Sequence, residues 1–291
     1  MLTERKSYEI PLPVKSEAML LDVKNPHDLR VAARLMAEGE AIIMPICGVM
    51  GFVCDATQDR GCDQIFDLKD RDRKQQLITA GSQLTRSRLI DYHKLNSSWE
   101  GFDFAGIYDI PTFVIFPAQA GLPRIFIKPD LEDQQTDTVA VWWANYYSGI
   151  KRLESFLQEI RPDAFIGGSS CNRSHHESIT KSDQAFREFG RGNDRVAAIV
   201  VDSAYDRGEG LINGSHTMLH VSGDKIKPFR PGSVHTDSFR TILGERLEVP
   251  ADFEDLPSAA LLDVAQIRKN RHYLRPETFS QRIFRLFRVT A

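Results

Sequence analysis

A short apolar strand runs directly into a polar turn at Ala164-Phe165-Ile166-Gly167-Gly168-Ser169-Ser170-Cys171-Asn172-Arg173-Ser174. The apolar residues at its start predict a buried strand, because they precede a cluster of turn-forming residues. Small hydroxyl and amide side chains follow at Ser170, Asn172 and Ser174. A turn of this kind leaves room for backbone N–H groups to approach an anion. The stretch therefore predicts a strand-to-turn anion site.

A pair of cations lies well upstream of this turn, at Lys69-Asp70-Arg71. Apolar residues at helical spacing predict a helix over Gln64–Arg71 that ends at the two cations. Taken alone, the two cations are explained by a solvated helix end, and the polar residues after the strand are explained by a simple turn. Together they supply positive charge and close backbone approach, which are what a polyphosphate site requires.

The composition is that of an ordinary globular protein. The chain has 291 residues, 42% hydrophobic and 26% charged, with a net charge of −3, so a basic nucleic-acid-binding surface over the whole protein is not expected. No apolar run approaches the ~18–20 residues of a membrane span, and the first residues lack the apolar core of a signal peptide. The four cysteines, Cys47, Cys54, Cys62 and Cys171, have no CxxC spacing. We therefore expect free thiols in a cytoplasmic protein without membrane contact.

Three regions are expected along the chain: an N-terminal arm over 1–24, a catalytic domain over 25–235 and a C-terminal extension over 236–291. The domain begins with a predicted helix at Asn25-Pro26-His27-Asp28, which combines a capping amide, a proline in the first turn and an acid. Further helices are expected over 64–71, 86–95, 147–160 and 178–189, and strands over 41–45, 51–54, 112–116, 125–127, 138–142, 164–168, 196–201 and 218–221. Because strands and helices interleave without strict alternation, we expect an α/β fold with a mixed sheet.

The C-terminal extension divides into an acidic connector, Glu248–Asp263, and a basic tail. The cations of the tail are Arg268, Lys269, Arg271, Arg275, Arg282, Arg285 and Arg288. One interpretation is a basic helix that packs its apolar face on the domain and exposes its charges. The other is a tail that contacts RNA or phosphate, with a salt-dependent contribution from each cation.

Five short segments occur in the order of the motifs of one known family. They are Pro45-Ile46-Cys47-Gly48-Val49-Met50-Gly51-Phe52, Lys69-Asp70-Arg71-Asp72, Ser170-Cys171-Asn172-Arg173-Ser174-His175, Gly214-Ser215-His216-Thr217-Met218 and Arg230-Pro231-Gly232. In this order they resemble the YrdC-like family of L-threonylcarbamoyladenylate synthases, which serve tRNA modification. The resemblance extends from about Leu29 to Gly232.

The resemblance implies a twisted mixed sheet around a large, positively lined cavity. It also implies a nucleotidyltransferase that joins bicarbonate, an amino acid or amine, and ATP, and releases pyrophosphate. By the same resemblance Lys69 and Arg71 are the catalytic cations, and the nucleotide is bound by Ser170, Asn172, Ser174, Ser215 and Arg230. A magnesium ion would bridge the phosphates, and no protein metal site is expected. Fixed cations suit this chemistry, because charge moves onto phosphate oxygens as the adenylate forms.

The chain departs from the family pattern at the acceptor end of the site. Ile46, Gly48 and Met50 replace two threonines and a tyrosine of the first motif, and Trp142 lies in a strand that has lost an arginine. Asp70 replaces a glycine between the two cations. Because a pocket that hydrogen-bonds a hydroxyl rejects analogues strongly, exchanging threonines for apolar residues predicts a different acceptor.

Two other functions remain open at this stage. The first is a nucleotide- or RNA-binding protein that has kept the cavity and lost catalysis, and the second is a carbamoyltransferase that uses carbamoyl phosphate. Cys47 is expected to be a buried thiol, with a nucleophile as the alternative. His175 and His176 diverge on a turn, and His216 and His220 would lie about 13 Å apart on a strand, so neither pair predicts a metal site.

Overall fold

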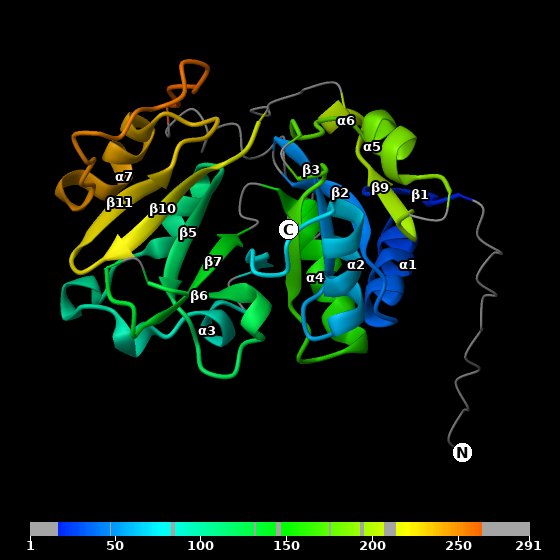
Figure 1. The fold of residues 1–291 in the computed structure, drawn as a ribbon, viewed down its shortest axis with the longest axis horizontal. Helices are drawn as coiled ribbons and strands as arrows, with labels where there is room; N and C mark the ends of the chain where they lie inside the picture. Colours follow the sequence, from blue (N-terminus) through cyan, green and yellow to red (C-terminus); the bar gives the residue numbers. More distant parts are fainter. Residues whose placement is uncertain are drawn as a thin grey trace, which may run out of the picture.

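The computed structural model describes residues 17–46, 48–82, 85–130, 132–143, 147–174, 176–192, 195–206 and 214–263. Its described strands form one mixed sheet of 11 strands in the order β1-β9-β2-β3-β8-β4-β7-β5-β10-β11, with β6 paired to β7 (Figure 1). The expected α/β fold with a mixed sheet is thereby confirmed. None of the described helices combines the length and the apolar character needed to cross a membrane.

The strands are β1 (Met19–Asp22), β2 (Ile42–Ile46), β3 (Val49–Asp55), β4 (Ile78–Gly81), β5 (Thr112–Pro117), β6 (Ile127–Pro129), β7 (Asp137–Trp143), β8 (Ile166–Ser170), β9 (Ala198–Val201), β10 (Thr217–Ser222) and β11 (Lys225–Arg230). The α-helices are α1 (Pro26–Ala37), α2 (Asp59–Lys69), α3 (Arg86–Leu89), α4 (Ser148–Ile160), α5 (Ser182–Phe189), α6 (Ser203–Asp206) and α7 (Arg240–Leu243). Short 3₁₀ helices occupy Tyr92–Lys94, Ser97–Trp99, Phe104–Asp109, Arg124–Phe126, Thr236–Phe239 and Gly244–Arg246.

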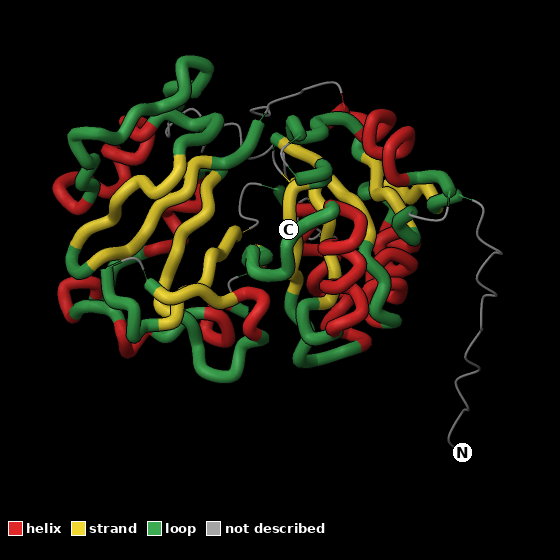
Figure 2. The backbone as a smooth tube through the Cα atoms, in the orientation of Figure 1, coloured by secondary structure: helices red, strands yellow, loops and turns green. Residues whose placement is uncertain are grey.

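Two apolar cores pack on opposite faces of the sheet. Helices α1 and α4 pack on each other and bury one core, which includes Met36 and Leu153; α1 contacts β2 and β9, and α4 contacts β4. Helices α2 and α5 cover the other face, where Phe66 and Phe189 are buried with the side chains of β3 (Figures 1 and 2). The long helices thus gather on the half of the sheet that contains β1, β9, β2, β3 and β8 (Figure 1).

Helix α1 begins as its sequence predicts. The side chain of Asn25 accepts a hydrogen bond from the backbone N–H of His27 at 3.0 Å, and Pro26 occupies the first turn. The chain reverses just after the helix at Gly39, whose φ of 83° is a conformation that glycine adopts at little cost. The capping amide and the glycine therefore fix both ends of the helix.

Helix α2 ends at Lys69, and the next residue, Asp70, adopts the left-handed conformation with φ 49° and ψ 51°. The backbone N–H of Arg71 then bonds the carbonyl of Phe66 at 3.0 Å, which closes the helix end and turns the chain back toward the sheet. Asp70 is exposed, so its carboxylate lies in solvent. The expected glycine-to-aspartate replacement thus falls where the backbone requires a positive φ.

Strand β8 carries the polar turn into the centre of the sheet, between β3 and β4. Ser170 pairs with Gly51, and Gly168 pairs with Val53. A Cβ atom on Gly168 would lie only 2.3 Å from the carbonyl oxygen of Phe52, so this position has no room for a side chain. The pair of glycines that precedes the turn therefore permits the close approach of β3 and β8.

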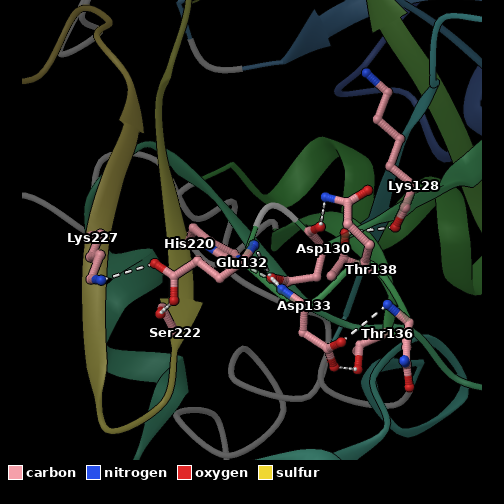
Figure 3. Close-up of polar contacts among 11 residues, drawn as sticks. Lys128, Asp130, Glu132, Asp133, Thr136, Thr138, His220, Ser222 and Lys227 are labelled. Carbon is pink, nitrogen blue, oxygen red and sulfur yellow. Dashed lines mark hydrogen bonds and ion pairs between the residues drawn. The ribbon is translucent and has the colours of Figure 1, made fainter.

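A polar cluster ties the loop after β6 to the β10–β11 hairpin (Figure 3). His220 Nε2 lies 2.7 Å from Asp130 Oδ2. Glu132 accepts hydrogen bonds from Ser222 Oγ and from Lys227 Nζ. Because these partners come from segments about 90 residues apart, the cluster fixes the hairpin that carries Arg230.

Segments on either side of the expected catalytic domain pair with strands of the sheet. Residues 19–22, expected within the arm, form β1 and pair in parallel with β9 at the edge of the sheet. At the other end, Leu247 and Ala260 bridge to Ile226 and Val234, so part of the expected extension packs on the domain. The earlier residues of the arm and the basic tail from Arg268 to Arg288 lie outside the described residues.

Candidate functional site

A pocket of about 550 Å³, its open mouth included, lies among the ends of β2, β8, β10 and β11. Its apolar lining consists of Ile46, Val49, Ile78, Phe113 and Met218. Its polar lining consists of Arg71, Gln76, Ser169, Ser170, Ser215, His216 and Arg230. Among the described residues of this lining there is no carboxylate, so the charged side chains that they bring to the pocket are positive and suit an anion.

Arg71 lies in the wall of the pocket and is fixed by the protein. Its Nη1 donates to Ser169 Oγ at 2.8 Å and its Nη2 donates to the carbonyl oxygen of Gln76 at 2.7 Å. Its Nε is buried and has no hydrogen-bond partner within the described parts of the chain. Burial and the positive charge of Arg230 lower the pKa of Arg71. Two cations that repel each other across a pocket are stabilised when an anion binds between them.

Arg230 reaches the same pocket from the end of β11. Its Nη2 donates to the carbonyl oxygen of His216 at 3.1 Å. A Cβ atom on Gly232 would lie 2.2 Å from the backbone nitrogen of Thr217, so the motif Arg230-Pro231-Gly232 needs its glycine for this chain crossing. The crossing holds Arg230 beside the segment that carries Ser215 and His216.

Lys69 is not among the residues that line the pocket; its side chain bonds the polar turn that follows β8. Its side chain is 2% exposed, and its Nζ donates to the carbonyl oxygens of Ser170 and Asn172, each at 2.5 Å. Burial, followed by the charge of Arg71, lowers the pKa of Lys69 to about 8. Of the two cations expected at the helix end, one thus faces the pocket and the other holds the turn.

The remaining residues of the expected nucleotide set divide in the same way. Ser170 and Ser215 line the pocket. Asn172 is buried, and its Nδ2 donates to the carbonyl oxygens of Arg173 and His176 at 2.9 and 2.8 Å. The backbone N–H of Ser174 bonds the carbonyl of Lys69 at 2.9 Å. Asn172 and Ser174 therefore shape the turn, whereas Ser170 and Ser215 are part of the pocket lining.

Only Ile46 of the expected acceptor residues lines the pocket. Gly48 has a φ of 99° in the β2–β3 turn, and its carbonyl accepts the N–H of Gly214 at 2.9 Å. Met50 is fully buried in the apolar core. Trp142 is buried one layer behind the pocket, with its ring 6.0 Å from that of His216. Cys47, between Ile46 and Gly48, and His175 lie outside the described residues.

His216 is a pocket residue that sequence reasoning considered only as a metal ligand. It lies immediately before β10, is 1% exposed, and meets the Phe113 ring edge-on at a centroid distance of 5.2 Å. Burial, together with the charge of Arg230, lowers the pKa of His216 to about 3. The one available signal was its place within Gly214-Ser215-His216-Thr217-Met218, directly after the motif serine.

Comparison with known proteins relates this site to one family. A sequence model named Sua5_yciO_yrdC and described as "Telomere recombination" matches residues 34–232. No curated protein matches the chain.

A double variant of Sua5 from P. abyssi has a TM-score of 0.61 and 20% identity, covering 79% of this chain and 65% of that one. P. abyssi Sua5 complexed with L-threonine also has a TM-score of 0.61, with 18% identity and coverage of 83% and 66%. E. coli YciO has a TM-score of 0.51 and 12% identity, with coverage of 74% and 94%. The chain spans just under two thirds of the length of the two Sua5 structures, and the likeness at these identities is one of fold.

Proposed function

Because the chain belongs to the Sua5/YciO/YrdC family, we propose that it is an ATP-dependent enzyme of the threonylcarbamoyladenylate synthase type. Members of this family are enzymes of tRNA modification. The proposed reaction joins bicarbonate to the amino group of an amino acid or amine, transfers AMP to the resulting carbamate and releases pyrophosphate.

One observation carries this proposal: Arg71 and Arg230 line a single pocket whose described residues include serine hydroxyls and no carboxylate. The reaction collects several anions, namely a triphosphate, bicarbonate and a substrate carboxylate. Fixed guanidinium groups bind such oxygens in a planar, two-pronged geometry. The pocket thus has the charge that this set of reactants needs.

The proposed reaction has two bond-forming steps. The amine nitrogen attacks the bicarbonate carbon, and loss of water leaves a carbamate. A carbamate oxygen then attacks the α-phosphorus of ATP, and the bond to pyrophosphate breaks. Arg71 and Arg230 would stabilise the negative charge that develops on the phosphate oxygens, and the pocket would supply alignment of the reactants.

A magnesium ion is expected with the nucleotide. The described residues contain no group of three or more His, Cys, Asp and Glu side chains arranged to hold a metal ion. The lining therefore does not offer the carboxylates with which proteins usually hold magnesium. Magnesium would enter the pocket as part of the ATP complex.

The acceptor is proposed to differ from threonine. Ile46 places an apolar side chain in the lining, and Gly48 contributes none. Together with Val49 and Phe113, Ile46 makes part of the pocket lining apolar. A lining of this kind favours the apolar part of an acceptor over its hydroxyl groups.

The test is pyrophosphate release with ATP, magnesium and bicarbonate across a panel of amino acids and amines. We expect turnover with at least one acceptor, and a loss of about 100-fold or more in Arg71→Ala. Arg73→Ala is the matched control, because Arg73 is 53% exposed and pairs with Asp63 and Asp67 outside the pocket. Absence of turnover with every acceptor, together with absence of binding to an ATP analogue, contradicts the proposal.

A further inference from the structure

Two buried thiols lie in contact where helix α2 packs on strand β3. The Sγ atoms of Cys54 and Cys62 are 3.6 Å apart, and the two residues are 0% and 1% exposed. Cys54 belongs to β3, where it pairs with Gly167 of β8, and Cys62 lies near the start of α2. The proposed reaction uses neither thiol, so their contact needs an explanation of its own.

The sequence allows the two sulfur atoms to approach this closely because Gly61 precedes Cys62. A Cβ atom on Gly61 would lie 2.9 Å from the Cβ atom of Cys54, so a larger residue would push α2 away from β3. A disulfide bond requires the sulfurs to close by only about 1.5 Å from their present separation. Small rotations of the two side chains cover a distance of this size.

The first turn of α2 is the route by which a small oxidant can reach the pair. The side chain of Gln58, the N-cap residue, donates to the carbonyl oxygen of Ala37 and makes no capping hydrogen bond within the described part of the chain. The backbone N–H of Cys62 lies 3.5 Å from the carbonyl oxygen of Gln58, which is a weak first helical bond. Residues 57, 59 and 60 around this turn are exposed. A helix start of this kind opens more readily than the helix interior.

The closed structure keeps both thiols unreactive. The hydrogen bond with Cys62, and then burial, raise the pKa of Cys54. Because the thiolate and not the thiol attacks an oxidant, the pair stays reduced while the first turn of α2 is closed. Opening of the turn brings Cys62 to water, where its thiolate can form, and leaves Cys54 next to it in the sheet. The second thiol needed for a disulfide is therefore already in place.

We propose that Cys54 and Cys62 form a modification site, at which a hydroperoxide converts the two thiols to a disulfide through the opened first turn of α2. The Cys62 thiolate attacks one peroxide oxygen, the O–O bond breaks, and the leaving oxygen takes up a proton. The Cys54 sulfur then attacks the resulting sulfenic sulfur, the S–OH bond breaks, and the hydroxide leaves as water with the Cys54 proton. Two thiols and one hydrogen peroxide thus give one disulfide and two waters. The modification is independent of the proposed enzyme activity.

Thiol counting on the full chain, with hydrogen peroxide as the probe, tests the proposal. The chain has four cysteines. Alkylation of the denatured protein should modify two of them after oxidation, and all four again after treatment with a thiol reductant. Trypsin releases Cys54 in peptide 35–60 and Cys62 in peptide 61–69, so the disulfide should join these two peptides. Since Cys47 also lies in peptide 35–60, the same link must form in Cys47→Ala.

Single replacements confirm which thiols react. Cys54→Ala and Cys62→Ala should each lose the linked peptides. Cys171→Ala is the matched control, because it removes another buried thiol, in the turn after β8, and should keep the link. If an alanine variant fails to fold, the wild type and Cys47→Ala decide the question. Four free thiols after prolonged exposure to peroxide, oxidation to sulfinic or sulfonic acid without a link, or a link through Cys47 or Cys171 overturns the proposal.

Two glycine variants test the route through the first turn. Arg60 and Asp67 are exposed residues near opposite ends of α2, and each takes part in one ion pair. Arg60→Gly weakens the first turn and should form the disulfide about 2–5-fold faster than the wild type. Asp67→Gly is the control, because it weakens the other end of the helix, and its rate should match the wild type. Equal acceleration in both variants would mean that the thiols react from the unfolded chain, which overturns the proposed route.

Discussion

The Nζ atom of Lys69 lies 2.5 Å from the carbonyl oxygen of Asn172, although 102 residues separate the two positions in the chain. The same nitrogen bonds the carbonyl of Ser170 and the side-chain oxygen of Asn172. One buried ammonium therefore satisfies three oxygens of the turn that follows β8. These bonds show that Lys69 fixes the conformation of this turn. The turn in that conformation places Ser170 in the pocket lining.

Replacing Lys69 by methionine should destabilise the protein and weaken nucleotide binding together. Methionine fills a similar volume but leaves buried carbonyl oxygens unpaired, which costs about 1–3 kcal/mol in the free energy of unfolding. Urea denaturation measures the stability, and calorimetry with an ATP analogue measures binding. Arg73→Ala is the control. Full stability with weakened binding would show instead that Lys69 contacts the ligand.

Lys69 should also give the stability a characteristic pH dependence. Its pKa is about 8 in the folded protein and near 10.4 in the unfolded chain. Between these values the unfolded state binds more protons, so this residue makes the free energy of unfolding rise with pH. We expect the wild type to gain stability relative to Lys69→Met from pH 8 to 10. A gap between the two unfolding curves that stays constant over this range contradicts the shifted pKa.

The exposed turn at Asp70 offers a stabilising substitution. With φ at 49°, an aspartate is strained where glycine is not. Asp70→Gly should therefore raise the free energy of unfolding by about 0.5–1 kcal/mol. Asp70→Ala is the matched control, since it removes the same carboxylate without relieving the backbone, and it should give no gain. An equal change in the free energy of unfolding in the two variants would show that loss of the Asp70 carboxylate charge, and not relief of the backbone, is the cause.

Much of the secondary structure could be predicted because its determinants are local. The capping residues of α1 and the β-branched runs of β5, β7 and β9 decide their own conformations. Strand β1 was expected within an arm because its partner, β9, lies about 180 residues later and no local pattern identifies it. The expected helix over 86–95 breaks after Leu89, where Ile90 pairs with Ala118 as an isolated bridge.

The site could be predicted only in part, because motifs give residue types and not side-chain directions. Arg71, Ser170, Ser215, Arg230 and Ile46 meet in the pocket as a set. Lys69 points into the turn and Met50 into the core, and both directions depend on how β8 and α2 pack. His216 was overlooked because its burial in the pocket lining, beside Phe113, depends on the pairing of β10 with β5, which no sequence motif records.

Arg230 should contribute to anion binding more than to stability. Within the described parts of the chain its side chain donates one hydrogen bond, of 3.1 Å to the carbonyl of His216, and it lines the pocket. Arg230→Ala should weaken ATP-analogue binding about 10–100-fold, since it removes a charge-assisted contact to phosphate oxygens or a carboxylate. Arg230→Lys should lose less than the alanine variant. Binding that is unchanged in Arg230→Ala and insensitive to salt would place the anion elsewhere.

The pair formed by His220 and Asp130 should make the sheet half that carries β10 and β11 sensitive to acid. Hydrogen bonds from the backbone of Asp133 and Glu132, and then His220, outweigh burial and lower the pKa of Asp130. A carboxylate whose pKa is lower in the folded state contributes stability at neutral pH, and this contribution is lost as the pH falls through its folded value. Asp130→Asn should therefore be less stable than the wild type at pH 7, by about 1–3 kcal/mol.

The difference in the free energy of unfolding between the wild type and Asp130→Asn should begin to narrow below about pH 4, because the unfolded chain takes up the proton there before the folded protein does. Urea denaturation at pH 7, 5 and 3.5 measures it. Asp224→Asn is the control, because Asp224 is an exposed residue in the turn between β10 and β11. This substitution should leave the free energy of unfolding unchanged at each of the three pH values. Since this hairpin also carries Arg230, the acid form of the wild type should bind the ATP analogue more weakly. A pH-independent difference would mean that Asp130 acts through its shape and not its charge.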